Sequence, residues 1–453
     1  MAFESRNPAT GELIGTYPEH DEAETNARLQ RAWDGWRRWS RTPLQERTAF
    51  LIRLADLLDA RAETYGRLIT AEMGKPIADS ISEVKKSALD ARHQAEAGEA
   101  YLKPQPIPGL PAQIIYESIG PIFSVQPWNL PFWQVLRFFN TAALVGNTAI
   151  VKHAETVQGS AEALETVVRD AGGPDGLYVN LAIQVKESAA VIADPRVRAA
   201  TVTGSVRAGR AVAEEAGRVG KKVVLELGGS DPFMVLEDAD LEKAVEHAVA
   251  SRYLNNGEGC ICAKRFLVAE PLLEAFCKAF VEQSEALPMG DPMKEGVKLG
   301  PLARSDSRHN LHRQVQDAIK AGARVLTGGQ IPAGPGNFYP PTVLIDLPPE
   351  AAIAKEEFFG PVAMIYGFKT EEEAIELANG TDFGLGAEVW SRDFERANRL
   401  ASRIEAGMVF INDVVHSDPR APFGGVKASG FGRELGRPGA LELTNPKLVW
   451  QAG

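Results

Sequence analysis

The stretch that decides the fold is Pro121-Ile122-Phe123-Ser124-Val125, a short apolar run that leads into the turn Gln126-Pro127-Trp128-Asn129-Leu130-Pro131. Such a run is typical of a strand buried on both faces. Helical patterns lie between this run and others like it, for example over residues 156–171. The alternation predicts an α/β fold with a parallel, doubly wound sheet that binds ligands at the carboxyl ends of its strands. The other runs are residues 149–151, 177–181, 200–203, 223–225 and 233–236.

The first hundred residues carry helical patterns instead. One covers residues 21–39, and a longer one begins at Pro43 and ends at Met73-Gly74-Lys75-Pro76, because Gly and Pro terminate helices. A second alternating series of strands and helices runs from about residue 240 to residue 451. With 453 residues the chain is long enough for two or three domains.

Composition excludes several classes of protein. The chain is 44% hydrophobic and 24% charged, as ordinary globular proteins are. The sequence contains no uninterrupted apolar run of about 18 residues, so no membrane span is predicted. A net charge of -11 opposes nucleic-acid binding. Its start lacks a secretion signal, and three cysteines cannot form a disulfide framework, so a reducing cytoplasm is the expected location. His309 and His312 have no partners with metal-ligand spacing, so no metal site is expected.

A single cysteine stands out in the stretch Asn255-Asn256-Gly257-Glu258-Gly259-Cys260. Glycines let the main chain crowd a small ligand, and the surrounding amides can stabilise negative charge on a thiolate. Cys260 is therefore a candidate nucleophile, active when its pKa is lowered. The alternative is a small buried hydrophobic side chain, which most free cysteines are.

Two segments have the features of a dinucleotide site. Thr203-Gly204-Ser205-Val206-Arg207-Ala208-Gly209 follows a strand and opens a helix, whose free amides suit a pyrophosphate. A plain β–α turn is the alternative. Lys152 and Glu155 lie where another strand ends, and both side chains can hydrogen-bond ribose hydroxyls. The alternative for this pair is solvent-exposed surface charge.

Two further side chains suit acid–base and oxyanion chemistry. Glu226 ends the apolar run Val223-Val224-Leu225, where desolvation raises a carboxyl pKa toward the range of a general base. A structural ion pair is the alternative. The Asn129 amide can donate to a developing oxyanion, although Asn and Pro also build turns that have no chemical role.

In order and spacing, these motifs resemble those of the aldehyde dehydrogenase superfamily from near the start of the chain to its end. The motifs that carry the resemblance are Pro127-Trp128-Asn129-Leu130-Pro131, Lys152, Thr203-Gly204-Ser205, Leu225-Glu226-Leu227-Gly228-Gly229, Gly257-Glu258-Gly259-Cys260, Lys355-Glu356-Glu357-Phe358-Phe359-Gly360-Pro361 and Pro422-Phe423-Gly424-Gly425-Val426-Lys427-Ala428-Ser429-Gly430.

The resemblance implies a mechanism of aldehyde oxidation to a carboxylic acid. Cys260 attacks the aldehyde, and the Asn129 amide with the Cys260 N–H holds the thiohemiacetal oxyanion. Hydride passes to a nicotinamide, and Glu226 activates water to hydrolyse the thioester. The cofactor contacts implied are Trp128, Lys152, Glu155, Gly204, Ser205, Gly209, Glu357 and Phe359.

Cofactor and substrate are expected as follows. The Glu155 carboxylate would repel a 2′-phosphate, so NAD is preferred, with NADP possible. The run from Pro131 to Arg137 looks like that of compact bacterial succinate-semialdehyde dehydrogenases, where an arginine clamps the substrate carboxylate. Arg137, with His416 and Ser417, therefore predicts oxidation of succinate semialdehyde to succinate. The alternatives are glutarate semialdehyde or an aliphatic or aromatic aldehyde.

The chain departs from the family pattern at three positions. Leu254 stands where some relatives carry a second arginine. Glu258 replaces a glutamine, and its charge is expected to raise the pKa of Cys260. Cys262 is a candidate redox switch, because a neighbouring thiol can trap oxidised Cys260 as a disulfide, while a packed thiol is the alternative.

By resemblance the architecture has three parts. A Rossmann-like NAD(P)-binding domain covers residues 1–100 and 120–228, and an α/β catalytic domain covers residues 229–436. A small β oligomerisation element combines residues 101–119 and 437–453, and its unpaired edge predicts a homodimer or homotetramer. A non-catalytic member of the fold or a thiol hydrolase is the competing reading, against which the joint presence of Cys260, Glu226 and Asn129 argues.

Overall fold

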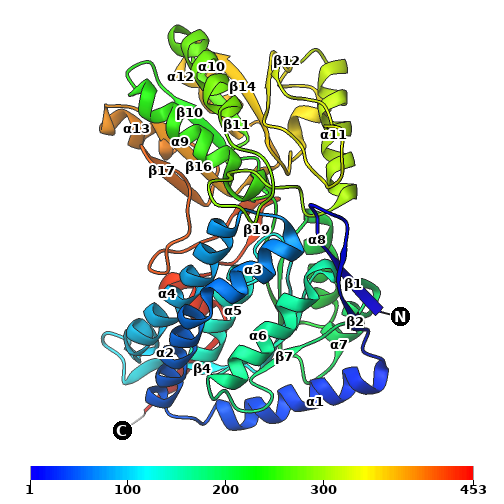
Figure 1. Cartoon of the computed structure of the whole chain (residues 1–453). Coiled ribbons are helices and arrows are strands. Elements are labelled where there is room, and N and C mark those ends of the chain that lie inside the picture. Colours follow the sequence, from blue (N-terminus) through cyan, green and yellow to red (C-terminus); the bar gives the residue numbers. More distant parts are fainter. Residues whose placement is uncertain (1, 452–453) are drawn as a thin grey trace.

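The computed structural model describes residues 2–451 and contains two α/β parts, each built on its own large sheet, with a small three-stranded sheet and two pairs of short strands. Figure 1 shows the first part, coloured blue to teal, below the second, coloured green to orange. The segment around β19 (Gly430–Phe431) lies between them. The predicted α/β class is therefore confirmed, but the run 233–236, predicted to continue the first series, lies in the second sheet as β10 (Pro232–Val235).

The first sheet has the strand order β19-β9-β8-β5-β6-β7, and its five longer strands are parallel. The chain extends from β5 to β7 on one side and then returns to place β8 and β9 on the other, so the order reverses between β5 and β8. Doubly wound sheets bind ligands in the crevice at such a reversal. The predicted strands are confirmed as β5 (Pro121–Val125), β6 (Thr148–Lys152), β7 (Tyr178–Asn180), β8 (Ala199–Thr203) and β9 (Lys222–Glu226).

Helices cover both faces of this sheet because neighbouring strand residues point to opposite sides. Ile122 belongs to the core beneath the larger helical layer, and Phe123 belongs to the core on the opposite face. The larger layer contains α2 (Leu44–Ala60), α3 (Ala62–Met73), α4 (Ile77–Leu102), α5 (Trp133–Leu144) and α6 (Gln158–Asp170). The other face packs against α1 (Glu22–Trp39), α7 (Ser188–Ala193) and α8 (Val206–Arg218).

Two helix predictions need correction. The single helix predicted from Pro43 to Met73 is two helices, because the backbone leaves helical geometry at Arg61 (φ -107°, ψ 12°). The helix predicted over residues 156–171 begins with the short turn η1 (Glu155–Val157) before α6. The helix predicted over residues 21–39 is confirmed as α1, whose first turn is capped by the Asp21 carboxylate accepting from the Glu24 N–H at 2.8 Å.

The second sheet has the order β12-β13-β14-β11-β10-β16-β17 and is parallel except for β12. Its strands are β10 (Pro232–Val235), β11 (Arg265–Ala269), β12 (Arg324–Thr327), β13 (Thr342–Ile345), β14 (Val362–Phe368), β16 (Gly386–Trp390) and β17 (Met408–Ile411). Its helices are α9 (Leu241–Tyr253), α10 (Glu270–Glu285), α11 (Ser305–Lys320), α12 (Glu371–Asn379) and α13 (Phe394–Ala401).

The small sheet pairs segments from distant parts of the chain, β20 (Thr444–Trp450) with β4 (Ala112–Ser118) and then β3 (Gln105–Pro106). Asn147 ties it to the first sheet: its side chain accepts from the N–H groups of Ile119 and Gly120 and donates to the Leu443 carbonyl. The predicted domain limits stay a prediction, and β19, inside the predicted catalytic range, pairs with β9 of the first sheet.

The remaining elements are short. They are β1 (Ala2–Arg6), β2 (Leu13–Pro18), β15 (Phe383–Gly384), β18 (Val426–Lys427), α14 (Gly436–Glu442) and the turns η2 (Val185–Glu187), η3 (Leu254–Gly257) and η4 (Ala352–Lys355). Within residues 2–451, no helix combines the length and the apolar character that crossing a membrane requires.

Candidate active site

Two cavities meet at Cys260, where the two α/β parts face each other. The strand-end cleft lies at the carboxyl ends of the first sheet, and the inner pocket lies beneath α4 and α5. The strand-end cleft is lined by Pro127, Trp128, Asn129, Gln134, Thr203, Gly204, Ser205, Glu226, Leu227, Gly228, Cys260, Glu357 and Phe359. The inner pocket is lined by Lys75, Asp79, Ser82, Glu83, Lys86, Leu130, Trp133, Gln134, Arg137, Leu254, Asn255, Gly259, Cys260, Ile261, Cys262, Ser417 and Phe423.

The loop that carries Cys260 is forced into its shape. Asn255, Asn256 and Gly257 all have left-handed backbone angles (φ 55°, 60° and 74°), which Asn and Gly tolerate best. A Cβ on Gly257 would lie 2.5 Å from the Gly360 backbone, so only glycine fits there. The sequence therefore places its glycine where two main-chain segments meet.

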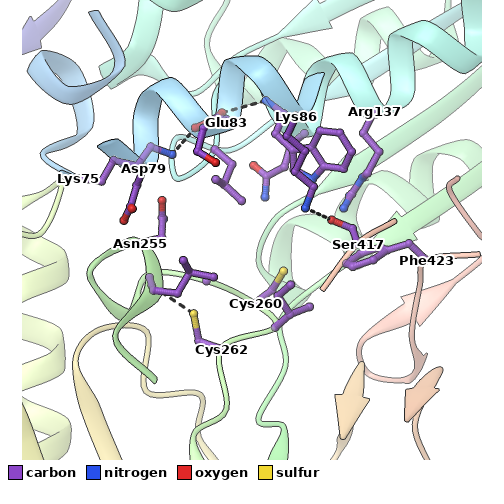
Figure 2. A pocket seen from close by; sticks show the side chains of 17 residues that line it. Lys75, Asp79, Glu83, Lys86, Arg137, Asn255, Cys260, Cys262, Ser417 and Phe423 are labelled. Atoms are coloured by element: carbon purple, nitrogen blue, oxygen red, sulfur yellow. Dashed lines mark hydrogen bonds and ion pairs between the residues drawn. The ribbon is translucent and has the colours of Figure 1, made fainter. Parts of the chain in front are cut away.

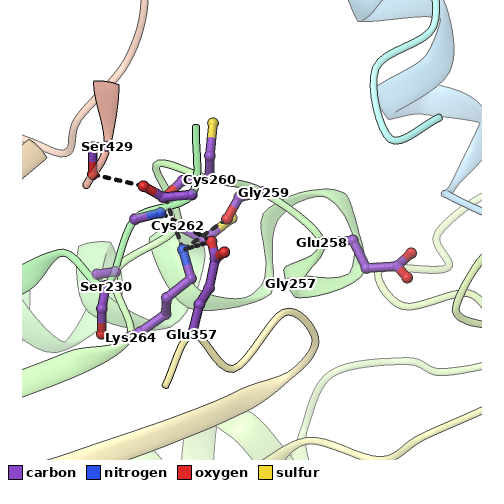
Figure 3. Close-up of polar contacts among 12 residues, drawn as sticks. Ser230, Gly257, Glu258, Gly259, Cys260, Cys262, Lys264, Glu357 and Ser429 are labelled. Atoms are coloured by element: carbon purple, nitrogen blue, oxygen red, sulfur yellow. Dashed lines mark hydrogen bonds and ion pairs between the residues drawn. The ribbon is translucent and has the colours of Figure 1, made fainter. Parts of the chain in front are cut away.

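Two buried cations hold the carbonyls of this loop. Arg252 donates to the Gly257 and Gly360 carbonyls at 2.6 and 2.9 Å. Lys264 donates to the Gly259 and Cys260 carbonyls at 2.9 and 2.8 Å, as Figure 3 shows. Because these hydrogen bonds fix the main chain of the loop, the Cys260 side chain has a defined position at the junction of the two cavities.

Burial raises the pKa of the Cys260 thiol to about 12, although Lys264 and Arg137 act in the opposite direction. This differs from the lowered pKa that the glycine-rich loop suggested. The reason is that the surrounding residues shield the partly exposed side chain from water, and within residues 2–451 the sulfur forms no ion pair with a cation. In the state described here the residue is a thiol at neutral pH.

Asn129 reaches the Cys260 loop from the first α/β part. It is buried, and its Nδ2 donates to the Glu258 carbonyl at 2.9 Å. In return, Asn255 Nδ2 donates to the Asn129 carbonyl at 3.1 Å. Within residues 2–451 the second N–H of the Asn129 amide has no acceptor, so it is available to a ligand at Cys260.

Glu226 ends β9 in the same cleft and is 2% exposed. Neither of its carboxylate oxygens has a hydrogen-bond partner among the described residues. Burial, with the nearby Glu434 carboxylate, raises its pKa well above the usual value, while Arg137 and Arg433 act in the opposite direction. The expected upward shift is therefore confirmed, and the ion pair that was its alternative does not form within residues 2–451.

The predicted cofactor residues lie along the strand ends. Gly204 and Ser205 line the cleft, and the Ser205 hydroxyl caps α8 by accepting from the Ala208 N–H at 3.3 Å. A Cβ on Gly204 would approach no atom closer than 3.9 Å, so the space beside it is open. A Cβ on Gly209 would instead collide with Leu227, which assigns Gly209 to the packing of α8 on the sheet.

Lys152 and Glu155 lie farther along the same edge and do not line the cleft at Cys260. Lys152 ends β6 and is buried, with its Nζ donating to the His153 carbonyl at 3.3 Å, while Glu155 begins η1 and is partly exposed. Burial lowers the pKa of Lys152, and Glu155 acts in the opposite direction.

The remaining predicted cofactor residues face the cleft from both parts of the molecule. Glu357 accepts from the Gly229 N–H at 3.1 Å and forms an ion pair with Lys264 at 3.5 Å. Phe359 meets Trp128 edge to face, with ring centroids 5.8 Å apart. The pair of rings forms one wall of the cleft.

Arg137 and Ser417 share the inner pocket with Cys260, as Figure 2 shows. The Arg137 guanidinium lies 4.3 Å from the centroid of the Phe423 ring, and its Nε donates to the Glu434 carboxylate. Ser417 is buried and accepts a hydrogen bond from the Lys86 Nζ at 2.7 Å. Both were predicted to contact substrate, and the structure brings both to the nucleophile's pocket.

The prediction for His416 needs correction. Its ring is exposed and packs against Phe410 with centroids 4.9 Å apart, in a neighbouring depression that does not include Cys260. The backbone alternates at this point, so that Ser417 turns inward while His416 turns outward.

The two departures from the family pattern beside the cysteine, Glu258 and Cys262, are both buried. The Glu258 side chain points away from Cys260 (Figure 3) and accepts from the Ala303 N–H at 3.2 Å. Burial raises its pKa, and it does not act on the thiol, so the expected effect on Cys260 is wrong. Cys262 is buried with its Sγ donating to the Leu254 carbonyl at 3.4 Å, and the redox switch stays a prediction.

Sequence reasoning missed the charged side chains beneath the turn that carries Asn129. Lys75 and Glu83 form a fully buried ion pair, and Lys75 Nζ also donates to the Asn129 carbonyl at 3.3 Å. Glu83 accepts from the N–H groups of Phe132 and Trp133 at 2.8 and 2.9 Å, at the start of α5. In the sequence these residues look like ordinary charges around a helix start, and no local signal separates them from surface positions.

A doubly wound sheet whose cleft holds a cysteine, an amide and a desolvated carboxyl is typical of dehydrogenases that work through a cysteine. The chain belongs to the aldehyde dehydrogenase family, whose family model matches residues 1–449. It is 47% identical to the NAD(P)+ succinate semialdehyde dehydrogenase Sad of Escherichia coli K12 over 449 residues, 99% of this chain and 97% of that protein.

Other relatives agree over the full length. A probable NADP(+) succinate-semialdehyde dehydrogenase of Synechocystis is 45% identical over 454 residues, which covers 100% of both chains. The crystal structure of a succinic semialdehyde dehydrogenase from Streptococcus pyogenes, in complex with NADP+, matches with a TM-score of 0.98 and 35% identity over 100% of both chains. The aldehyde dehydrogenase fold expected from the motifs is therefore confirmed.

The raised pKa of Cys260 predicts how its thiol reacts with iodoacetamide. Since only the thiolate is alkylated, the rate constant should rise about tenfold for each pH unit from 7 to 10, without a plateau. The measurement is the incorporation of label over time, with the labelling of the Cys260→Ser variant subtracted to remove the other two thiols. A plateau below pH 9 would contradict the expected burial effect.

Proposed function

We propose that this protein oxidises succinate semialdehyde to succinate with NAD or NADP. The observation that carries the proposal is the presence of Arg137 and Ser417 in the same pocket as Cys260. A guanidinium and a hydroxyl suit a carboxylate, and the junction with the strand-end cleft suits the aldehyde end. Several full-length relatives bear the name of this activity.

The strand-end cleft fits a dinucleotide cofactor. It lies at the reversal of strand order between β5 and β8, with open space beside Gly204 and the amino end of the 13-residue helix α8 next to it. When bound, the nicotinamide supplies the acceptor for the hydride. The residues proposed to hold the cofactor are Trp128, Lys152, Glu155, Gly204, Ser205, Glu357 and Phe359.

The proposed reaction begins when the Cys260 thiol loses its proton to water and the thiolate sulfur attacks the aldehyde carbon. The C=O π electrons move to oxygen, and the oxyanion is held by the free N–H of the Asn129 amide and the Cys260 backbone N–H. Donors fixed before reaction stabilise the tetrahedral state without reorganisation. Arg137 and Ser417 hold the distal carboxylate, which keeps the aldehyde carbon beside the sulfur.

Loss of hydride leaves a thioester on Cys260, which Glu226 is proposed to resolve. Its ionised carboxylate takes a proton from water as the water oxygen attacks the thioester carbon. The C–S bond then breaks, the Cys260 thiolate leaves, and the acid is released. Because burial raises the pKa of Glu226, the base is ionised only above that raised pKa, and kcat falls as pH drops below it.

A substrate panel tests the proposal. Initial rates are measured for succinate semialdehyde, glutarate semialdehyde, butanal and benzaldehyde with each cofactor, and Cys260→Ser is the inactive control. Succinate semialdehyde should give the highest kcat/KM. If butanal or benzaldehyde equals or exceeds it, the proposed substrate is wrong, while activity in Cys260→Ser would refute the proposed nucleophile.

For the cofactor we propose a preference for NAD over NADP, carried by Glu155. Its carboxylate lies at the β6 end of the cleft edge, beside Lys152, where it would repel a 2′-phosphate. Names of relatives point to NADP(+) or to both cofactors, so the charge at this position is the feature to test.

Glu155→Ser should raise the ratio of kcat/KM for NADP to that for NAD by roughly tenfold or more, because like charges brought together cost several kcal/mol. The exposed Glu162→Ser on the neighbouring helix α6 is a matched control and should leave the ratio unchanged. A wild-type enzyme that prefers NADP would overturn the proposed preference.

Glu226→Gln should separate the two halves of the reaction. Acylation of Cys260 continues while hydrolysis slows, so stopped-flow absorbance should show a burst of one reduced cofactor per active site. Steady-state kcat should fall by roughly 10²- to 10⁴-fold, as for loss of a general base. An unchanged kcat without a burst would remove Glu226 from the mechanism.

We also propose a homodimer or homotetramer. The edge strand β20 exposes Leu448 and Trp450, which are 57% and 53% exposed, and an apolar sheet edge favours pairing with another copy. Light scattering should give at least twice the chain mass of 49.0 kDa.

A reducing cytoplasm remains the proposed location, because Cys260 must stay reduced to act.

A further inference from the structure

Lys86 lies in the inner pocket but has no part in the mechanism described above. It projects from α4, and its Nζ donates to Ser417 Oγ at 2.7 Å and lies 4.6 Å from the centroid of the Trp133 ring. Figure 2 shows Lys86, Arg137 and Ser417 together on one wall of the pocket, with Asp79 on the opposite side next to Asn255.

The cationic side chains that line the inner pocket differ in whether a carboxylate neutralises their charge. Lys75 is compensated by its buried ion pair with Glu83, and Arg137 is compensated by Glu434. Lys86 has no carboxylate within 4.0 Å among residues 2–451 and sits partly buried. It is therefore the cation on this wall whose charge is left uncompensated.

The direction of the hydrogen bond between Lys86 and Ser417 also favours a negatively charged ligand. A lysine ammonium can only donate, so the Ser417 hydroxyl accepts from it and keeps its own O–H to donate elsewhere. Lys86, Ser417 and the outer nitrogens of Arg137 thus present donors, and no acceptor, to the same part of the pocket. A set of donors with one uncompensated positive charge matches a carboxylate.

We propose that Lys86 is the residue that selects for a negatively charged aldehyde, because it supplies the net positive charge that Arg137, paired with Glu434, does not. The inference rests on the proposed function and deepens it. Arg137 gives the carboxylate a planar guanidinium to lie against, and Lys86 gives it the uncompensated charge and orients Ser417.

The electrostatic surroundings of Lys86 agree with this assignment. Burial lowers its pKa to about 8, and Arg137 on α5 acts in the same direction. Glu83 and Asp90 on α4 and Asp418 in the following loop act in the opposite direction. The ammonium is therefore present at neutral pH and is lost as pH rises through about 8, whereas a bound carboxylate would stabilise it.

The test compares kcat/KM for succinate semialdehyde with kcat/KM for butanal, in which a methyl group replaces the carboxylate. Their ratio cancels effects on Cys260 and Glu226. Lys86→Met should lower the ratio roughly 10- to 100-fold, mainly through KM for succinate semialdehyde, since a charge-assisted contact is lost. Lys86→Arg should retain most of the ratio, and the exposed neighbour Lys85→Met should retain all of it.

The pH dependence of the same ratio gives a second readout. In the wild type the ratio should fall as pH rises from 7 to 9.5. The midpoint should lie near pH 8, because burial lowers the pKa of Lys86 to about 8. In Lys86→Arg the ratio should stay flat, because arginine does not titrate in this range. This arm needs only the wild type if Lys86→Met fails to fold.

The outcomes separate this inference from the proposed function. If the wild type prefers succinate semialdehyde but its ratio is independent of pH and within twofold of that of Lys86→Met, the role of Lys86 is refuted while the function stands. If the wild type shows no preference for succinate semialdehyde over butanal, the proposed function fails and the role of Lys86 fails with it.

Discussion

The active site depends on a reciprocal pair of hydrogen bonds between the two α/β parts. Asn129 Nδ2 donates to the Glu258 carbonyl at 2.9 Å, and Asn255 Nδ2 donates back to the Asn129 carbonyl at 3.1 Å. Both bonds are buried, where an unmade partner is costly. They join the turn after β5 to the loop of Cys260, so the relative position of nucleophile and amide follows from the contact between the two parts.

Buried charges support this contact from both sides. Lys75 and Glu83 hold the turn from the α4 side, through the Asn129 carbonyl and the first N–H groups of α5. Lys264 holds the cysteine loop from the other part. Each cation binds main-chain carbonyls, and each sits beside a carboxylate that balances its charge. In such an arrangement the ion pairs and hydrogen bonds offset the desolvation free energy of the buried charges, and they order the main chain around the reacting atoms.

Much of the fold could be predicted from the period of the apolar residues, since strands buried on both faces leave continuous runs such as Pro121–Val125. The break between α2 and α3 could not be predicted, because it falls at Arg61 and no Gly or Pro marks that position in the sequence. Within the site, Glu226 was predictable from its place at the end of an apolar strand. The direction of the Cys260 pKa shift was not, because it depends on how far other segments of the chain, distant in sequence, shield the thiol from water.

By itself the sequence determined the family, the alternating α/β order and the chemical types of Cys260, Glu226 and Asn129, because these are properties of local pattern and motif. Only the tertiary structure decided which side chains share a pocket. It turned Ser417 inward and His416 outward, and it left Lys86 uncompensated while pairing Arg137 with Glu434. Compensation of charge is a relation between residues far apart in the chain, in this case 297 positions for Arg137 and Glu434, so no local stretch of sequence can specify it.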